Sequence, residues 1–358
     1  MQFVKIHNET ELLEWVKQFL SCDAISMMNT LNDQITRNQV MDSAYKLVRQ
    51  AYLERNPIAE ESAHEILTLI YNLEFSSANI ERVSADPLPI LQDISFILET
   101  AILNHEITQI DSSRLAQDIK TSETYETWLR KVMMEHRAAK HEYYDDFLPN
   151  RANKDDIKYL LSQETSLDPR FDDILALMQI GTQGQEKMEI ASNYWDEMGN
   201  GEYAQVHTHL FAKALEAVGA SDAYIQDSLT FEAKVSGNLS ASLALRRRNY
   251  FKAVGYFGVT EYLAPRRFAS LVKAWEKNNL PTEGIKYHKL HIKIDAIHGN
   301  AWIKNVICPL AEKSPDIGLD IAVGAMIRLN SSKRYLDRLL KNCDKSIQFK
   351  EEDRAHAS

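Results

Sequence analysis

The sequence is poor in cysteine and in long apolar runs, and both shortages argue against classes of protein. Among 358 residues there are three cysteines, Cys22, Cys308 and Cys343, far apart and without a CxxC pair. This spacing argues against a disulfide framework and against a thiolate metal site. No apolar run approaches the roughly 18 residues that cross a membrane, and the first residues, MQFVKIHNETELLEWV, lack a signal-peptide profile. We therefore expect a cytoplasmic protein without a membrane partner.

Positive charge is also in short supply. The chain has 41 lysines and arginines against 51 aspartates and glutamates, which gives a formal net charge of −10. A surface that binds nucleic acid neutralises phosphates with an excess of basic residues. The charge balance therefore predicts that no nucleic acid is a partner.

Glycine and proline, which interrupt helices, are sparse as well, with 12 and 9 residues respectively. Apolar residues recur at helical spacing, and the first such stripe consists of Leu12, Trp15, Val16 and Phe19. Similar stripes follow within residues 44–53, 63–73 and 89–103, whereas strand-type alternation is hard to find. The pattern predicts an all-α fold.

A polar stretch, HEITQIDSSRLAQDIKTSE, starts at His105 and separates two helical regions. We expect residues 1–118 to form an N-terminal helical region used for packing or for assembly into a homodimer. Residues 119–341 are expected to form the main helical domain. The remaining residues, 342–358, read as a polar C-terminal tail.

The richest cluster of chemically active side chains is HKLHIKIDAIHG, residues 288–299. Since a helix turns about 100° per residue, Asp295 and His298 lie within about 40° of His291 on one face. His288, at roughly 60°, is the outlying member. One reading is a set of buried histidines that hydrogen-bond to neighbours. The other is a metal site, because a buried aspartate normally has a cation beside it, and imidazole with carboxylate suits iron, manganese or zinc.

Two other segments offer ligands of the same kind. In NYWDEMGNGEYAQVHTHLF, Glu197 precedes a Gly-Asn-Gly interruption, and His207 and His209 follow it. The glycines are expected to break the helix and turn both halves toward one centre. Glu261 stands in an apolar, aromatic run, YFGVTEYLAP. Each has an alternative reading: Glu197 as an exposed helix end, and Glu261 as the ion-pair partner of Arg266 or Arg267.

These segments resemble the haem-oxygenase-like diiron oxidases, a family of iron-containing redox enzymes. DEMGNGEYAQVHTHLF is similar to the family's Glu, glycine-rich break, His and Leu-Phe signature, which selects His207 over His209. His-x3-Asp-x2-His is matched by His291, Asp295 and His298, and an isolated glutamate about thirty residues earlier is matched by Glu261. The resemblance covers roughly residues 122–320 and leaves His288 outside the pattern, as an outer or incidental residue.

The family also takes a glutamate from its first core helix. The best match is Glu164 in YLLSQETSLDPRF, although its distance from Glu197 implies a short insertion near Gly181–Gln185. Asp168 and Glu189 are the alternatives. The resemblance thus implies seven metal ligands, with Glu197 as the bridging carboxylate: Glu164, Glu197, His207, Glu261, His291, Asp295 and His298.

The resemblance further implies an up-and-down helical bundle that holds two iron ions and no haem. Members use O2 and an electron donor to oxidise a small molecule. We expect an O2-dependent oxygenase or oxidase acting on a small amine- or carboxylate-bearing substrate, with N-oxygenation favoured. Desaturation, C–C cleavage or oxidative decarboxylation of an aliphatic or amino acid is the alternative, because these reactions share one ligand set.

Two further hypotheses come from other classes. One is a helical hydrolase of the thiaminase type, which would use a cysteine nucleophile, but no cysteine stands near the candidate ligands. The other is a non-catalytic helical protein whose histidines and acids are structural or bind metal. For substrate binding, the run LALRRRNYFKAVGYFG offers Arg247, which suits a carboxylate, and Tyr256, which suits a pocket wall. A solvated basic face is the alternative reading of Arg246–Arg248.

Overall fold

The computed structural model describes residues 11–76, 89–115 and 121–356, and these residues form helices, turns and loops without a strand. The predicted all-α fold class is confirmed. No helix in the described ranges has a stretch that is both long enough and apolar enough to cross a membrane. The chain divides into two compact units, the first comprising residues 1–109 with 237–242, and the second comprising residues 110–236 with 243–358.

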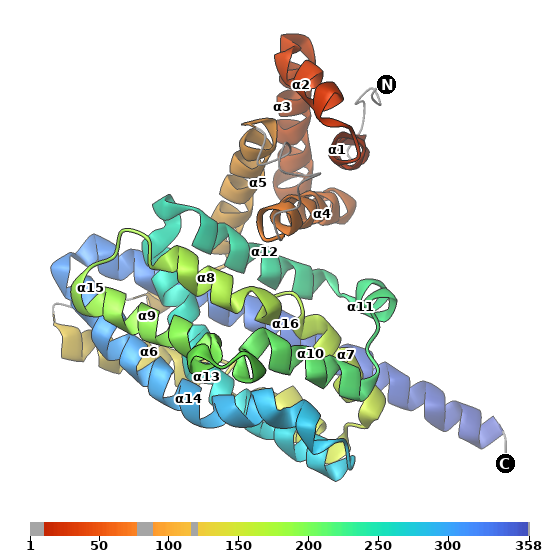
Figure 1. Ribbon diagram of the computed structural model, residues 1–358, viewed down its shortest axis with the longest axis vertical. Coiled ribbons are helices and arrows are strands. Elements are labelled where there is room, and N and C mark those ends of the chain that lie inside the picture. Colours follow the sequence, from red (N-terminus) through yellow and green to blue (C-terminus); the bar gives the residue numbers. More distant parts are fainter. Residues whose placement is uncertain (1–10, 77–88, 116–120, 357–358) are drawn as a thin grey trace. The chain divides into compact units, whose positions relative to one another are not determined.

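The first unit is a small helical assembly in which α3, α4 and α5 pack on one another (Figure 1). Its predicted stripe is confirmed, because Leu12, Trp15, Val16 and Phe19 are all buried. Asn56 caps α4 by accepting hydrogen bonds from the backbone of Ile58 and Ala59. The helices are α1 (Glu11–Leu20), α2 (Ala24–Asn32), α3 (Gln34–Val48) with the π-helical turn η1 (Arg49–Leu53), α4 (Pro57–Glu74) and α5 (Pro89–Thr108).

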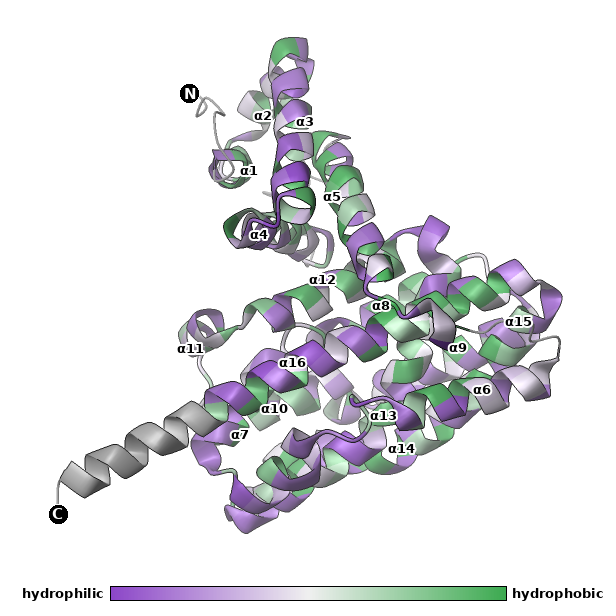
Figure 2. Ribbon diagram, turned by 180° about the vertical axis from the view of Figure 1, so that it is seen from behind, coloured by the Kyte–Doolittle hydropathy of each residue, from purple (hydrophilic) through white to green (hydrophobic). Residues whose placement is uncertain are grey.

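The second unit is a larger bundle built around two long helices, α13 (Tyr250–Lys277) and α16 (Pro315–His356). α13 packs on α16 and on α14 (Lys286–Trp302), and Figure 1 shows α13 and α14 running side by side. Figure 2 shows hydrophobic and hydrophilic residues interleaved along the helices of this unit, as expected for helices buried on one side. Trp275 and Trp302 are among its largest fully buried side chains.

Shorter helices complete the second unit, except that residues 237–242 within α12 belong to the first unit. In chain order the α-helices are α6 (Ser122–Glu135), α7 (Lys154–Glu164), α8 (Phe171–Met178), α9 (Gly184–Glu197), α10 (His207–Val218), α11 (Asp222–Ser228), α12 (Phe231–Leu245) and α15 (Cys308–Lys313). The π-helical segments are η4 (Tyr143–Arg151) and η10 (Ile303–Ile307). The 3₁₀ turns are η3 (Ser112–Arg114), η5 (Asp168–Arg170), η6 (Gly199–Gly201), η7 (Tyr203–Gln205), η8 (Arg247–Asn249) and η9 (Thr282–Ile285).

The packing of α14 on α13 depends on Gly299. A Cβ atom at this position would lie 2.7 Å from Cα of Tyr262 and 3.1 Å from the carbonyl carbon of Glu261. Both contacts are to backbone, which does not swing away like a flexible side chain. Glycine therefore lets the two backbones approach beside Glu261 and His298, two of the predicted ligands.

We predict that Gly299→Ala destabilises the protein by about 2 kcal/mol, because the added methyl overpacks the helix crossing. Urea unfolding followed by circular dichroism measures the change. Gly318→Ala in α16 is the matched control, since the atoms nearest to its Cβ belong to the Tyr125 ring at 3.3 Å and to Ala311 at 3.6 Å. We expect the control to stay within about 1 kcal/mol of the parent. Equal stabilities of the two variants would contradict the role given to Gly299.

Candidate metal centre

The predicted break between Glu197 and His207 is present. Glu197 is the last residue of α9, and the backbone then passes through Gly199, Asn200 and Gly201 with φ of 60°, 54° and 89°. A Cβ on Gly199 would lie 2.5 Å from the carbonyl carbon of Gln205, so both the positive φ and the space require glycine. The chain reverses there, and α10 begins at His207. As a result, Nδ1 of His207 lies 2.7 Å from Oε2 of Glu197.

The first group of potential ligands consists of Glu197, His207 and His291, whose ligand atoms lie within 4.8 Å of one another. All three residues are buried. Nε2 of His291 lies 3.7 Å from Oε1 of Glu197, while its Nδ1 is 2.8 Å from the carbonyl oxygen of Tyr287. A donor bond to that carbonyl leaves Nε2 as the nitrogen that faces the carboxylate.

The second group consists of Glu261, Asp295 and His298, again with ligand atoms within 4.8 Å of one another and all buried. Glu261 comes from α13, and the other two come from α14. Pro265 follows Glu261 by four residues in the same helix, and its missing N–H leaves the Glu261 carbonyl without the usual helical hydrogen bond. Arg266 pairs with Asp145 at 2.8 Å, so it is not the partner of Glu261.

The two groups face a common space. A small cavity of about 40 Å³ is lined by Glu197 and His291 from the first group and by Glu261 and Asp295 from the second. Asp168, Phe268 and Tyr287 also contribute to its wall. Six side chains from four helices, α9, α10, α13 and α14, therefore converge on one buried region.

This region buries more carboxyl groups than its histidines could balance if all of the carboxyl groups were ionised. Burial, together with the charges of Asp295 and Glu197, raises the pKa of Glu261 well above its usual range. Burial likewise raises the pKa of Asp295 to about 7, against the charge of His291. Among the described residues, neither carboxyl group has a hydrogen-bond or ion-pair partner. Such a set is stabilised by a cation, and its oxygen and imidazole donors suit iron.

The pKa of Glu197 is lowered and that of His291 is raised, because the two side chains lie close to each other. Burial would raise the pKa of Glu197, but the hydrogen bond with His207 and the His291 imidazole 3.7 Å away lower it to about 2. Burial would lower the pKa of His291, but Asp295 and Glu197 raise it to about 10. In the metal-free chain these charges compensate one another, and a metal ion would take over the role of the histidine protons.

His298 has a partner that the sequence did not reveal. Its Nε2 lies 2.7 Å from Oδ2 of Asp196, the residue next to Glu197. Carboxylates commonly hold a metal-binding histidine in its orientation in this way. The only signal in the sequence was the acidic pair Asp196–Glu197 itself. His209 stands outside the cluster and packs on Tyr203, with ring centroids 5.1 Å apart.

Glu164 lies apart from the two groups. Its Oε2 is 3.7 Å from Nε2 of His288, the outlying histidine, and it lines a neighbouring cavity rather than the one that Glu197 and Glu261 share. Burial raises the pKa of Glu164 to about 7, against the charge of Arg267, and lowers the pKa of His288 to about 3, with the charge of His291 acting in the same sense. Asp168, four residues later, lines both cavities, and its Oδ2 is buried without a hydrogen-bond partner.

The remaining candidates occupy other environments. Glu189 accepts hydrogen bonds from the amides of Asn193 and Asn305 at 3.2 and 2.7 Å. Arg247 is exposed and lies over the Tyr250 ring, and it lines neither cavity. Tyr256 is fully buried, and its hydroxyl donates to the carbonyl oxygen of Ser236 at 3.2 Å.

An all-α bundle with histidine and carboxylate groups converging on its interior is the architecture of helical metalloproteins. The chain has a more specific relationship: residues 158–333, about half of its length, match the family model described as iron-containing redox enzyme. This region belongs to that family, and the predicted resemblance is confirmed. No curated protein matches the chain. Family membership and the two buried groups together indicate an iron-binding oxidoreductase.

The raised pKa values predict a pH dependence for the metal-free protein. A carboxyl group with a raised pKa stabilises the folded chain below its unfolded pKa of about 4, and the contribution is lost as pH rises through the folded value. The contribution of His291 to the stability of the folded chain is also lost as pH rises, from its unfolded pKa of about 6.5 through its folded pKa of about 10. His288 and His298, whose pKa values are lowered, are neutral in both states above pH ~7 and add no slope.

We therefore predict that the metal-free protein loses stability as pH rises above ~7, where His291 stays protonated in the folded chain but not in the unfolded one. Glu261→Gln removes a group whose pKa is raised and should reduce the loss of stability with rising pH by up to ~1.4 kcal/mol per pH unit. Urea unfolding at a series of pH values, in the presence of a chelator, provides the measurement. Glu123→Gln on the exposed side of α6 is the control and should keep the parent slope. If the free energy of unfolding of Glu261→Gln changes with pH as steeply as that of the parent, Glu261 does not titrate as described.

Proposed function

We propose that this protein is a non-haem diiron oxygenase that activates O2 to oxidise a small amine- or carboxylate-bearing substrate, with N-oxygenation as the favoured reaction. The observation that carries the proposal is the presence of two separate candidate ligand groups, Glu197–His207–His291 and Glu261–Asp295–His298, each with two members that line one buried cavity. Each group supplies three donors, enough to hold one metal ion while coordination positions stay open. Membership in a family of iron-containing redox enzymes favours iron over manganese or zinc.

The positions of the side chains support particular roles. Glu197 lies 2.7 Å from His207, and its charge also acts on Glu261 and Asp295, so we assign it as the carboxylate that bridges the two ions. We assign Asp168, rather than Glu164, as the additional carboxylate, because Asp168 lines the shared cavity. Asp196 is assigned as the group that orients His298. The aromatic walls, Phe268 and Tyr287, would limit access of water.

The bound irons would supply the electrons needed to activate O2. N-oxygenation of a primary amine to a hydroxylamine consumes one O2, two electrons and two protons and releases one water, so an electron donor is a required partner. Desaturation, C–C cleavage and oxidative decarboxylation would use the same ligands and remain the alternative reactions. A metal-binding protein without catalysis is the alternative from another class. We retain a cytoplasmic location as part of the proposal.

Iron content and the response to O2 test the proposal directly. Anaerobic loading with Fe(II) should give about two irons per chain, and addition of O2 should produce a transient visible absorption. His207→Ala and His298→Ala each remove a donor from a different group and should each reduce the iron content by about one ion and abolish the transient. His209→Ala, two residues from His207 but outside the cluster, is the matched control and should behave as the parent. Less than one iron per chain in the parent would refute the diiron assignment.

The choice between Asp168 and Glu164 is tested by a pair of isosteric variants. Asp168→Asn should lower iron affinity at least tenfold, because it removes a carboxylate from the shared cavity. Glu164→Gln should leave the affinity within about threefold of the parent. Competition with a chromogenic chelator provides both values. A large loss in Glu164→Gln together with none in Asp168→Asn would restore Glu164 as the ligand and refute our assignment.

Two iron ions without O2 chemistry would favour the non-catalytic alternative. If the transient does appear, mass spectrometry of a reacted amine separates the oxidation reactions. A gain of one oxygen atom supports N-oxygenation, whereas loss of two hydrogens or of carbon dioxide supports the alternatives.

A further inference from the structure

The cavity of about 40 Å³ that the two ligand groups share is called the metal-facing cavity below. Beside it lies a second cavity of about 80 Å³. By the measure in which a water requires about 10–15 Å³, it holds roughly six waters or a molecule with a similar number of non-hydrogen atoms. The two cavities share Leu167, Asp168, Thr260, Ala264 and Phe268 in their walls. A small molecule in the second cavity would therefore lie next to the candidate metal centre.

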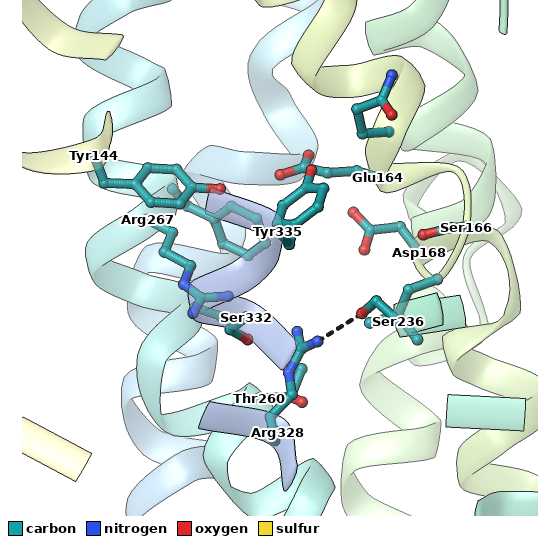
Figure 3. A pocket seen from close by; sticks show the side chains of 14 residues that line it. Tyr144, Glu164, Ser166, Asp168, Ser236, Thr260, Arg267, Arg328, Ser332 and Tyr335 are labelled. Atoms are coloured by element: carbon teal, nitrogen blue, oxygen red, sulfur yellow. Dashed lines mark hydrogen bonds between the residues drawn. The ribbon is translucent and has the colours of Figure 1, made fainter. Parts of the chain in front are cut away.

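Two arginines reach this cavity from different helices (Figure 3). Arg267 belongs to α13, and its Nε and Nη2 atoms are buried without a hydrogen-bond partner. Arg328 belongs to α16 and is 7% exposed, and its Nε atom also lacks a partner. No ion pair joins either guanidinium to another described residue. Two cations with buried, unused donor atoms form a site for an anion.

The environment of Arg328 holds it in place. Its Nη1 donates to Oγ of Ser236 at 3.0 Å and to the Tyr256 hydroxyl at 3.4 Å. The guanidinium also lies over the Tyr256 ring, 5.2 Å from the centroid. Arginine presents its donors as a planar fork that matches the two oxygens of a carboxylate. A pre-positioned arginine therefore loses little entropy when a carboxylate binds.

The opposite wall of the cavity carries two carboxyl groups. In Figure 3 the carboxyl groups of Glu164 and Asp168 point into the cavity from the side facing the arginines. Oε2 of Glu164 and Oδ2 of Asp168 are buried without hydrogen-bond partners. A cavity with cations at one wall and carboxylates at the other complements a ligand that carries both charges.

We propose that this cavity binds a small amino acid, with its carboxylate between Arg267 and Arg328 and its ammonium group beside Glu164, on the side where Asp168 joins this cavity to the candidate metal centre. The inference rests on the proposed function, because the amino acid is the molecule that would be oxidised at the adjacent centre. Since Asp168 lines both cavities, this orientation brings the amine, rather than the carboxylate, next to the metal-facing space. The orientation agrees with N-oxygenation as the favoured reaction.

Binding is tested without relying on catalysis. The full chain, metal-free and loaded anaerobically with Fe(II), is titrated calorimetrically with α-, β- and γ-amino acids of two to six carbons. Each amino acid is compared with the amine of the same skeleton that lacks the carboxylate. We expect at least one amino acid to bind, and its carboxylate-free amine to bind at least tenfold more weakly.

Variants of neighbouring arginines locate the site. Arg267→Gln should weaken binding of that amino acid at least tenfold, and Arg267→Lys should give an intermediate loss, because lysine keeps the charge without the fork. Arg266→Gln is the matched control, since Arg266 is exposed on the same helix and pairs with Asp145. It should bind as the parent does. Circular dichroism verifies that each variant is folded, and Arg328→Gln provides a second test from α16.

Three results would overturn the inference: no amino acid of the panel binds, the carboxylate-free amine binds equally well, or both Arg267→Gln and Arg328→Gln bind as the parent does. The last result would identify the arginines as structural counterions of Glu164 and Asp168. The proposed function fails separately. If the parent binds no iron but Arg267-dependent binding persists, the amino-acid site stands and the diiron function falls. If iron and O2 chemistry are present without such binding, only the amino-acid site falls.

Discussion

The main electrostatic constraint on the second unit is the burial of several carboxyl groups in one small region. Asp168, Glu197, Glu261 and Asp295 all line the metal-facing cavity, and His291 is the histidine on the same wall. Taking an unpaired carboxylate out of water costs several kcal/mol, so the chain bears a substantial electrostatic cost here. Without metal, that cost is reduced by protonation, as the raised pKa of Glu261 indicates. With metal bound, the same groups become donors.

The surrounding helices are arranged to hold these groups against their mutual repulsion. Gly299 brings α14 against α13 at the position of Glu261, and Gly199 reverses the chain so that His207 reaches Glu197. Both glycines therefore lie next to candidate ligands in the chain or in space, Gly199 near Glu197 and Gly299 near Glu261. Two large aromatic residues of α14 itself, Tyr287 and Trp302, are buried among the neighbouring helices. A rigid frame of this kind would keep the donors of a metal site fixed.

The second cavity extends this electrostatic arrangement. In that cavity, the carboxyl groups of Glu164 and Asp168 lie on one side and Arg267 and Arg328 on the other. The two regions meet at Asp168, which lines both. Under the proposed function, the cluster determines where oxidation occurs, and the arginines determine which end of the substrate is turned away from it.

Much of the fold, and of the placement of the candidate ligands, follows from the sequence alone. Helical periodicity determined the all-α class, because burial of one helix face requires apolar residues every three or four positions. The same periodicity placed His291, Asp295 and His298 on one face, and the Gly-Asn-Gly break predicted that Glu197 and His207 face each other. These relations are local, spanning at most a few helical turns, and local geometry is what a single sequence encodes most directly.

Only the tertiary structure decided relations between distant segments. It placed Asp168, and not Glu164, on the wall of the shared cavity, because the turn after α7 carries the chain past Glu164 before it reaches the cluster. It paired Asp196 with His298, 102 residues apart. It also brought Arg267 and Arg328 to one cavity, where neither has a carboxylate partner in the described chain. Arg328 stands in the apolar run IAVGAMIRLN, which marks it as buried, but its neighbours depend on how α13, α16 and α7 pack. Packing of this kind is set by side chains from several helices at once, and no local pattern contains it.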